Sequence, residues 1–245
     1  QILCQHRDEV MAKQGAKLDW PTRYQQLLAQ SKQPLIKAFY ESAICDLSTP
    51  ISDVPLVALD FETTGLNYQN DDIVSVGLIP FNTKRIFCKD SQHWIVQPRR
   101  KLAEESIVIH GITHSEVSDA PDFSTIMEPL LAALKGKIIV VHFAPIERHF
   151  LYQALQARLG EGLEFAVIDT LDLETRALKA KQGLLGRLFN SKIDSVRLAD
   201  SRIRYSLPAY QNHNALNDAT ATAELLQAQI AYHYRPDTPL SELLI

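Results

Sequence analysis

Apolar positions near the start of the chain recur at helical spacing. They are Trp20, Tyr24, Leu27, Leu28, Leu35, Ile36, Phe39 and Tyr40. The pattern predicts short helices within residues 1–50, which are too few to form a core alone and are expected to pack on the rest of the chain. Thr49-Pro50 and Val54-Pro55 then interrupt the helical pattern, so we place a domain boundary there.

Beyond this boundary the pattern changes to strands, and then to helices and strands in alternation. Three strands are predicted over 56–62, 73–80 and 85–96, with a turn at 81–84. They are followed by a helix over 123–134, a strand over 138–142, a helix from Pro145, a strand over 165–168 and helices to about residue 234. A meander followed by strands that helices separate predicts an α/β fold with a mixed sheet.

Composition and charge narrow the class of protein. The chain has 245 residues, 46% of them hydrophobic, so a sizeable core needs neither disulfides nor metals. Its three cysteines lie far apart, which predicts a reducing, cytoplasmic setting. No apolar stretch approaches the roughly 20 residues of a bilayer span, so no membrane contact is expected. A net charge of -4 argues against coating of nucleic acid by bulk electrostatics.

Two acids, Asp60 and Glu62, end the first predicted strand. Residues two apart on a strand point to one face, with their Cα atoms about 7 Å apart, so the carboxylates can converge. Paired metal ions in enzymes lie roughly 4 Å apart, a separation that such acids can span. In the alternative interpretation, both acids only begin the Thr-Thr-Gly turn and face water.

A further acid, Asp218, begins the last long predicted helix and follows His213 by five residues. Five helical residues turn through about 500°, so His213 belongs on the loop before the helix. The small residues Ala215 and Ala219 would let this helix approach a sheet closely. The spacing suits a metal ligand with a separately placed base; the alternative is a helix-capping region with a solvated acid.

Glu147 lies in the first turn of the helix that follows the strand over 138–142, two residues after Pro145. An acid in a first helical turn is favourable through the helix dipole in any protein, so by itself it indicates little. His142 ends the preceding strand and is predicted to be a packed or solvated histidine and not a metal ligand.

These elements, in this order, resemble the DEDDh group of the DnaQ-like 3′ to 5′ exonucleases, which includes the proofreading epsilon subunit of DNA polymerase III. The resemblance covers residues 54–234. It is carried by Asp60-Phe61-Glu62-Thr63-Thr64-Gly65-Leu66, by His213 with Asp218, and by Ile109-His110-Gly111-Ile112-Thr113, which is similar to the family's HGIT loop. The chain departs from the second motif of the family, because Phe143 and Glu147 stand where the family usually has Asn and Asp.

The resemblance implies a ribonuclease H-like fold, a mixed five-stranded sheet with flanking helices. This exonuclease domain would span 54–234, after a helical N-terminal extension over 1–50 and before a C-terminal tail over 235–245. Residues 1–50 lie outside the resemblance and are a candidate surface for a protein partner.

The resemblance also implies a metal site with two Mg²⁺ or Mn²⁺ ions. Asp60 would bridge both ions, Glu62 and Asp218 would complete the protein ligands of the first, and Glu147 would serve the second. His213 would act as general base, because imidazole titrates near neutral pH.

The implied substrate is the 3′ end of a nucleic acid, with single-stranded DNA favoured over RNA and nucleoside 5′-monophosphates as products. The residues implied in contacts to the terminal nucleotide are Thr64, Gly65, Leu66 and His110.

The stretch from Arg176 to Arg204 holds eight basic and two acidic residues. It predicts either a solvated face or a segment that follows the phosphates of a long strand just before His213. In the second interpretation Arg197, Arg202 and Arg204 would contact the strand.

Two other functions fit part of the sequence. A HAD-type phosphatase would use a strand-end acid such as Asp60 as its nucleophile, but it normally has a second Asp where this chain has Glu62. A non-catalytic nucleic-acid-binding module of the same fold is the other alternative, because Phe143 and Glu147 break the second motif. Cleavage of a labelled strand distinguishes these functions.

Overall fold

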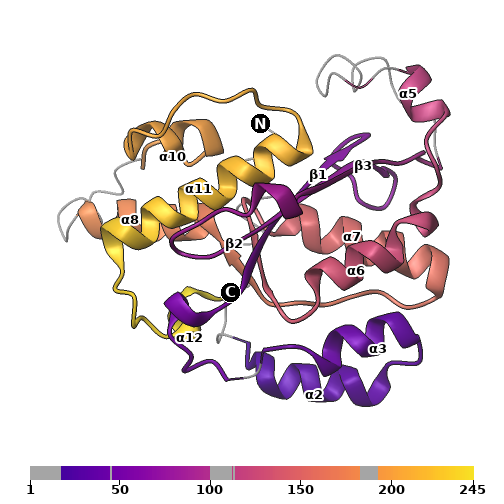
Figure 1. The fold of residues 1–245 in the computed structure, drawn as a ribbon, viewed down its shortest axis with the longest axis horizontal. Coiled ribbons are helices and arrows are strands. Elements are labelled where there is room, and N and C mark those ends of the chain that lie inside the picture. The colour runs from indigo at the N-terminus through magenta and orange to yellow at the C-terminus, as the bar shows by residue number, and fades with distance from the viewer. Residues whose placement is uncertain (1–17, 45, 100–111, 113, 183–192) are drawn as a thin grey trace.

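A five-stranded mixed sheet forms the centre of the molecule (Figure 1). The computed structural model describes residues 18–44, 46–99, 112, 114–182 and 193–245. The strands are β1 (Leu56–Thr63), β2 (Ile73–Phe81), β3 (Gln92–Ile95), β4 (Ile138–Val141) and β5 (Val167–Asp169), in the spatial order β3-β2-β1-β4-β5. The β1–β2 and β2–β3 pairs are antiparallel, whereas the β1–β4 and β4–β5 pairs are parallel. The predicted mixed five-stranded sheet is confirmed.

Helices flank this sheet, as predicted. They are α2 (Trp20–Gln30), α3 (Pro34–Glu41), α5 (His114–Ser118), α6 (Met127–Leu134), α7 (Pro145–Leu159), α8 (Thr170–Lys181), α10 (Leu198–Arg204), α11 (Ala215–His233) and α12 (Leu240–Leu243). Figure 1 shows α11 on one side of the strands and α6 and α7 on the other, and both α11 and α7 contact β1. Because helices cover the sheet, β1 is an apolar run that is buried at every position except Asp60.

The third strand is shorter than the sequence predicts. The apolar pattern predicts a strand over 85–96, but β3 covers only Gln92–Ile95, because a 3-10 turn occupies Cys88–Asp90. The predicted turn at 81–84 is present: the Asn82 side-chain oxygen accepts hydrogen bonds from the backbone N–H groups of Lys84 and Arg85. An edge strand needs little apolar surface, so its ends are poorly marked in the sequence.

The N-terminal helices pack into the same core as the sheet. Trp20 and Tyr24 of α2 and Ile36 of α3 are buried there. The Trp20 indole donates a hydrogen bond to the Ile245 carbonyl at 2.8 Å, and the Tyr24 hydroxyl accepts one from Ala166 N–H at 2.7 Å. These contacts bring both ends of the described chain to the side of the sheet where β5 lies.

The C-terminal residues cover the outer edge of β5. Leu244 forms an antiparallel bridge with Ile168, and Ile245 N–H donates to the Val167 carbonyl at 3.1 Å. An uncovered strand edge would offer unpaired backbone groups to other chains. Among the described residues, no helix has both the length and the apolar character that crossing a membrane requires.

Candidate active site

The two acids of the first motif lie at the end of β1. Asp60 is paired with Gly77 of β2, and Glu62 with Ser75. The pairing register shifts between Glu62 and Thr63, where regular pairing of the strand ends. Because residues two apart on a strand share a face, both carboxylates point to the same side of the sheet.

Helix α11 brings the third acid, Asp218, to that side. A Cβ atom on Gly77 would lie 2.2 Å from the backbone carbon of Ala215, so only glycine lets the start of the helix rest on β2. The helix begins at Ala215 because the side chain of its N-cap residue, Asn214, accepts a hydrogen bond from Asn217 N–H. The predicted close approach of this helix to the sheet is confirmed.

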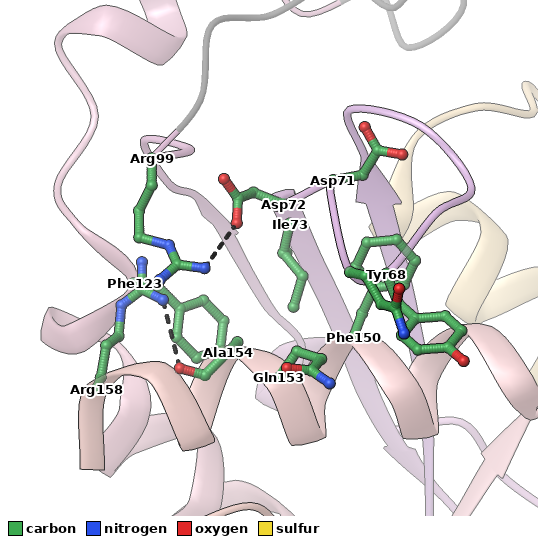
Figure 2. Close-up of a pocket in the computed structure, with 11 residues that line it drawn as sticks. Tyr68, Asp71, Asp72, Ile73, Arg99, Phe123, Phe150, Gln153, Ala154 and Arg158 are labelled. Atoms are coloured by element: carbon green, nitrogen blue, oxygen red, sulfur yellow. Dashed lines mark hydrogen bonds and ion pairs between the residues drawn. The ribbon is translucent and has the colours of Figure 1, made fainter. Parts of the chain in front are cut away.

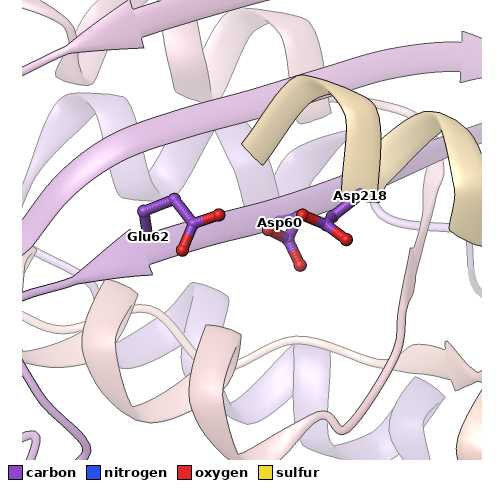
Figure 3. Close-up of side chains that lie close together, drawn as sticks. All are labelled: Asp60, Glu62 and Asp218. Atoms are coloured by element: carbon purple, nitrogen blue, oxygen red, sulfur yellow. The ribbon is translucent and has the colours of Figure 1, made fainter. Parts of the chain in front are cut away.

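Asp60, Glu62 and Asp218 together form an acidic cluster, in which one carboxylate oxygen of each residue lies within 4.8 Å of those of the other two (Figure 3). Burial, and then the nearby carboxylates of Glu147, Asp218 and Glu62, raise the pKa of Asp60 well above its usual value. Grouped carboxylates repel one another unless protons or cations intervene. An all-oxygen donor set of this kind suits a hard divalent cation.

Glu147 lies beside this cluster, in the first turn of α7, although it is not one of its three acids. Its side chain is only 2% exposed, and its Oε2 atom has no hydrogen-bond partner among the described residues. Burial, and the nearby Asp169, raise the pKa of Glu147 well above its usual value. A buried, unpartnered carboxylate oxygen fits the role of ligand to a cation that binds between Glu147 and the acidic cluster.

A buried acid that the sequence did not single out, Asp169, holds the loop that precedes Glu147. Its carboxylate accepts hydrogen bonds from Phe143 N–H at 3.0 Å, Ala144 N–H at 2.9 Å and Leu171 N–H at 2.9 Å. Phe143 has a φ of 87°, a left-handed conformation that Asn adopts more readily than Phe. An Asn at this position would therefore fit the local backbone with less strain than Phe143 does. The sequence pattern that could have identified Asp169 is an acid at the end of a predicted strand, directly before a predicted helix.

His142 is a packed histidine, one of the two environments predicted for it. Its Nε2 atom donates to the Val196 carbonyl at 3.0 Å, and its Nδ1 atom lies 2.8 Å from the Thr170 hydroxyl. Burial lowers the pKa of His142 to about 4, against weaker opposing effects of the Val196 carbonyl and Glu174. The imidazole therefore stays neutral in the folded protein at neutral pH and joins the end of β4 to α8.

This lowered pKa predicts a dependence of stability on pH. Between pH 6.5 and 4 the unfolded chain binds a proton at His142 that the folded chain does not, so the free energy of unfolding falls as the pH falls, by at most about 3 kcal/mol. His142→Gln should lose this slope. Urea unfolding of the metal-free wild type and of metal-free His142→Gln across this pH range measures the difference between their free energies of unfolding. The buried acids contribute to stability with the opposite dependence on pH, but both proteins contain them, so their contributions cancel in this difference. Parallel curves would show that His142 does not titrate as inferred.

His213 lies in the turn that precedes α11, as predicted from its spacing. It is exposed, has a φ of 64°, and directly precedes the N-cap residue Asn214. Histidine is one of the few residues found several-fold more often in this left-handed conformation, and such backbone often occurs at functional sites. His213 is not part of the acidic cluster, but the Asn214 N–H donates to Asp218 Oδ2 at 3.1 Å and so joins its turn to the cluster.

Three of the four residues predicted to contact a terminal nucleotide, Thr64, Gly65 and Leu66, lie on the loop after β1. Asp71 stabilises this loop by accepting hydrogen bonds from the Thr64 hydroxyl and Asn67 N–H, and a Cβ atom on Gly65 would lie 2.5 Å from its carboxylate. Leu66 is 54% exposed at the tip of the loop. His110, the fourth predicted contact, lies outside the described residues.

A small pocket lies between part of this loop and α7 (Figure 2). Arg99 pairs with Asp72 at 3.4 Å in its lining, and Arg158 lies in the same wall. Its volume of about 40 Å³ is far below the roughly 300 Å³ of the smallest ordinary ligand pockets, so it does not accommodate a nucleotide.

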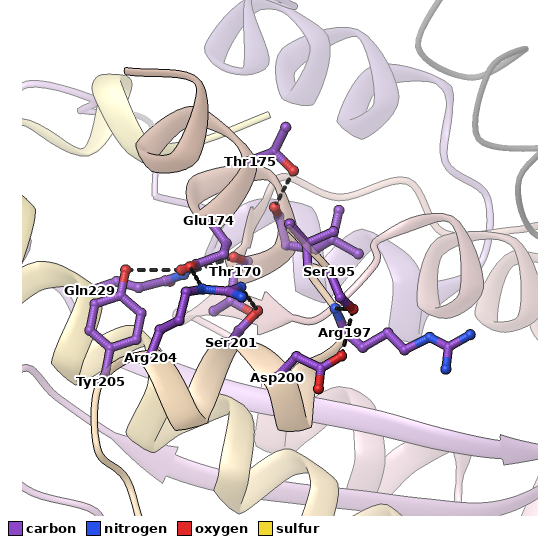
Figure 4. A network of polar contacts seen from close by, with 12 residues as sticks. Thr170, Glu174, Thr175, Ser195, Arg197, Asp200, Ser201, Arg204, Tyr205 and Gln229 are labelled. Atoms are coloured by element: carbon purple, nitrogen blue, oxygen red, sulfur yellow. Dashed lines mark hydrogen bonds and ion pairs between the residues drawn. The ribbon is translucent and has the colours of Figure 1, made fainter. Parts of the chain in front are cut away.

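The basic stretch is only partly available to a substrate. Arg202 is buried, with 2% of its side chain exposed, and Arg204 is paired with the buried Glu174 at 2.6 Å. Figure 4 shows Arg204 among the polar side chains around Glu174, where Tyr205 and Gln229 also donate to this carboxylate at 2.9 Å. The prediction that Arg202 and Arg204 contact phosphates is therefore wrong, because both side chains make internal contacts. Arg197 is exposed and keeps the predicted role as a proposal.

Comparison with known proteins identifies the family. The family model for RNase T, described as an exonuclease, matches residues 57–226, a range that contains all four acids and His213. The chain is 30% identical to the PolC-type DNA polymerase III of Thermotoga maritima over 187 residues, which are 76% of this chain but only 13% of that polymerase. It is 28% identical to the DNA polymerase III epsilon subunit of Treponema pallidum, covering 74% of this chain and 78% of that subunit.

Solved structures agree on the fold. The cell-death related nuclease CRN-4 matches with a TM-score of 0.62 and 17% identity, over 76% of this chain and 66% of that one. The nuclease domain of 3′hExo, a DEDDh family member bound to rAMP, matches with a TM-score of 0.57 and 14% identity, over 73% of this chain and 92% of that one. The family model and the relatives and structures named above are exonucleases, nucleases or DNA polymerase III proteins, which does not favour the phosphatase alternative. The chain belongs to the RNase T exonuclease family.

Proposed function

We propose that this protein removes nucleotides one at a time from the 3′ end of single-stranded DNA and releases nucleoside 5′-monophosphates. The observation that carries this proposal is the acidic cluster, with His213 in the turn that leads into α11. DNA is favoured over RNA because the curated relatives are DNA polymerase III proteins. Since the chain spans only a small part of the PolC-type relatives, neither their polymerase activity nor their assembly is transferred to it.

The chain's own residues would divide the work. Asp60 would bridge two divalent cations, Mg²⁺ or Mn²⁺, while Glu62 and Asp218 complete the ligands of one and Glu147 serves the other. Such cations offset the negative charge that develops on the attacked phosphate and the leaving oxygen. His213 would accept a proton from the attacking water, because an exposed imidazole on a turn can move within reach of the scissile phosphate.

The substrate would reach these acids past the loop after β1. Thr64, Gly65 and Leu66 would contact the terminal nucleotide, with Leu66 exposed where a base can pack against it. His110 would contact the same nucleotide. We further propose that residues 54–234 form the catalytic domain and that residues 1–50, beside the tail over 235–245, offer a surface to a protein partner.

Strand polarity tests the proposed activity. A 5′-labelled single strand, incubated with protein and Mn²⁺, should give a ladder that shortens from the 3′ end, and a phosphorothioate at the last linkage should delay it. A circular single strand should remain intact. Label released first as a mononucleotide, or cutting of the circle, would contradict the proposal. Retained binding without cleavage would favour the non-catalytic module.

Glu147 offers a second test, at the position where the chain departs from its family. Glu147→Gln keeps the size of the side chain but removes the charge, so at limiting Mn²⁺ we expect cleavage to slow about 10-fold or more. Glu147→Asp should retain activity, because a peripheral ligand tolerates a change of reach better than a bridging one. We also expect the wild type to cleave faster with Mn²⁺ than with Mg²⁺, because Mg²⁺ demands stricter octahedral geometry of its ligands.

Cleavage rates across a Mn²⁺ titration measure these effects. If Glu147→Gln were as fast as the wild type at limiting Mn²⁺, Glu147 would be only a helix-terminus acid. Unfolding of the metal-free proteins is the control: Glu147→Gln should be at least as stable as the wild type, because burial disfavours the charged carboxylate.

A further inference from the structure

Asp218 is the acid of the cluster that α11 contributes, and hydrogen bonds hold both of its carboxylate oxygens. Oδ1 accepts from the Tyr210 hydroxyl at 2.9 Å, and Oδ2 accepts from Asn214 N–H at 3.1 Å. Two donors on opposite oxygens fix the plane of a carboxylate. Each oxygen keeps a lone pair for another partner, so the free lone pairs of Asp218 point in fixed directions.

Arg202 in turn holds the ring of Tyr210. Its guanidinium lies 4.9 Å from the ring centroid, a cation–π contact. The same guanidinium donates to the Ala221 carbonyl at 2.8 Å and the Pro208 carbonyl at 3.0 Å, and pairs with Glu224 at 2.7 Å. These partners lie on α11 and on the loop that leads to Tyr210, so Arg202 joins that loop to the helix that bears Asp218.

Burying an arginine is costly unless its charge and its N–H groups find partners. In this chain the two terminal nitrogens of the Arg202 guanidinium find such partners, at the Pro208 carbonyl two residues before Tyr210 and at the Ala221 carbonyl and Glu224 on α11. The arrangement therefore places a buried charge against the ring of Tyr210, whose hydroxyl reaches one carboxylate of the acidic cluster.

We propose that Tyr210 is a positioning residue for the metal site, which fixes the orientation of the Asp218 carboxylate while Arg202 fixes Tyr210. This inference rests on the proposed function, in which Asp218 is a ligand to a divalent cation. Hydrogen-bond partners of metal-ligating side chains typically contribute about 10- to 100-fold to metal affinity or activity. Without the Tyr210 hydroxyl, Asp218 can rotate, and cation binding must then also fix its orientation.

The test is Tyr210→Phe, which removes the hydroxyl but keeps the ring against Arg202. Tyr205→Phe is the matched control, because it deletes a Tyr–carboxylate hydrogen bond of the same 2.9 Å length, to Glu174 instead of Asp218. Calorimetric titration of Mn²⁺ into metal-free protein should show affinity about 10- to 100-fold lower in Tyr210→Phe and unchanged in Tyr205→Phe. The KM for the strand should not change, and saturating Mn²⁺ should restore the rate of Tyr210→Phe.

Wild-type affinity for Mn²⁺ in Tyr210→Phe would overturn the inference, as would an equal loss in Tyr205→Phe, which indicates a general loss of packing. If Tyr210→Phe lost activity that saturating Mn²⁺ did not restore, Tyr210 would act on the substrate and not on the metal site. A wild-type protein that neither bound Mn²⁺ nor cleaved DNA would instead overturn the proposed function itself.

Discussion

Replacing Asp60 by Asn should abolish cleavage and, at the same time, stabilise the metal-free protein. Asp60 is paired with Gly77 on β2, directly beneath the start of α11, and burial and three neighbouring acids raise its pKa. Losing a bridging ligand removes several kcal/mol of stabilisation from the transition state, which corresponds to about 10³-fold or more in rate. Removing one of several mutually repelling carboxylates relieves the folded state of that repulsion.

Initial rates at saturating Mn²⁺ and thermal unfolding in chelator measure the two effects of Asp60→Asn. Asp53→Asn is the matched control, since Asp53 is an exposed acid just before the same strand and should change neither quantity. A lower melting temperature for Asp60→Asn without metal would mean that Asp60 stabilises the fold. Inactivity would then no longer be evidence for metal binding.

His213→Ala should reduce the cleavage rate by roughly 10² to 10⁴-fold, the range typical of a removed general base. Affinity for Mn²⁺ should stay the same, because His213 is exposed and lies outside the acidic cluster. The variant thus separates proton transfer from metal binding, which Asp60→Asn cannot do.

Single-turnover rates and calorimetric Mn²⁺ titration of the same His213→Ala preparation distinguish these effects. His233→Ala is the control from the other end of α11, where His233 contacts Tyr205 and none of the four acids. A wild-type rate would remove His213 from the mechanism. Loss of Mn²⁺ affinity would mean that the turn before α11 positions Asp218 and supplies no base.

Local patterns were enough to predict the main sheet and the acids that the structure brings together. The apolar run before Asp60 marks β1, and the small residues around Asp218 indicated the close approach to a sheet that Gly77 permits. Such signals are local. The alternation of side chains along a strand places Asp60 and Glu62 on the same face of the sheet, and a helix can approach a strand closely only where its side chains are small. The metal and substrate roles of these residues stay predictions.

The remaining features depend on contacts between distant segments. The basic run predicted that Arg202 lies on a solvated face or contacts the phosphates of a strand. Its partners are instead Glu224 and the backbone carbonyls of Pro208 and Ala221, which no residue pattern reveals. Tyr210 carries no motif of its own, and its hydroxyl is informative only because it reaches Asp218. Asp169 was overlooked because a helix-capping acid is common and its bonds to the loop before Glu147 are tertiary.

Calorimetric titration of Mn²⁺ into the metal-free wild type and into Asp60→Asn tests most directly whether the acidic cluster is a divalent-metal site. The three carboxylates that meet within 4.8 Å should bind Mn²⁺ in the wild type, with heat that disappears in Asp60→Asn although the variant stays folded. Equal binding by both proteins would place the metal elsewhere. The absence of binding in the wild type, at Mn²⁺ concentrations that support cleavage of a single strand, would contradict a metal site at these acids altogether.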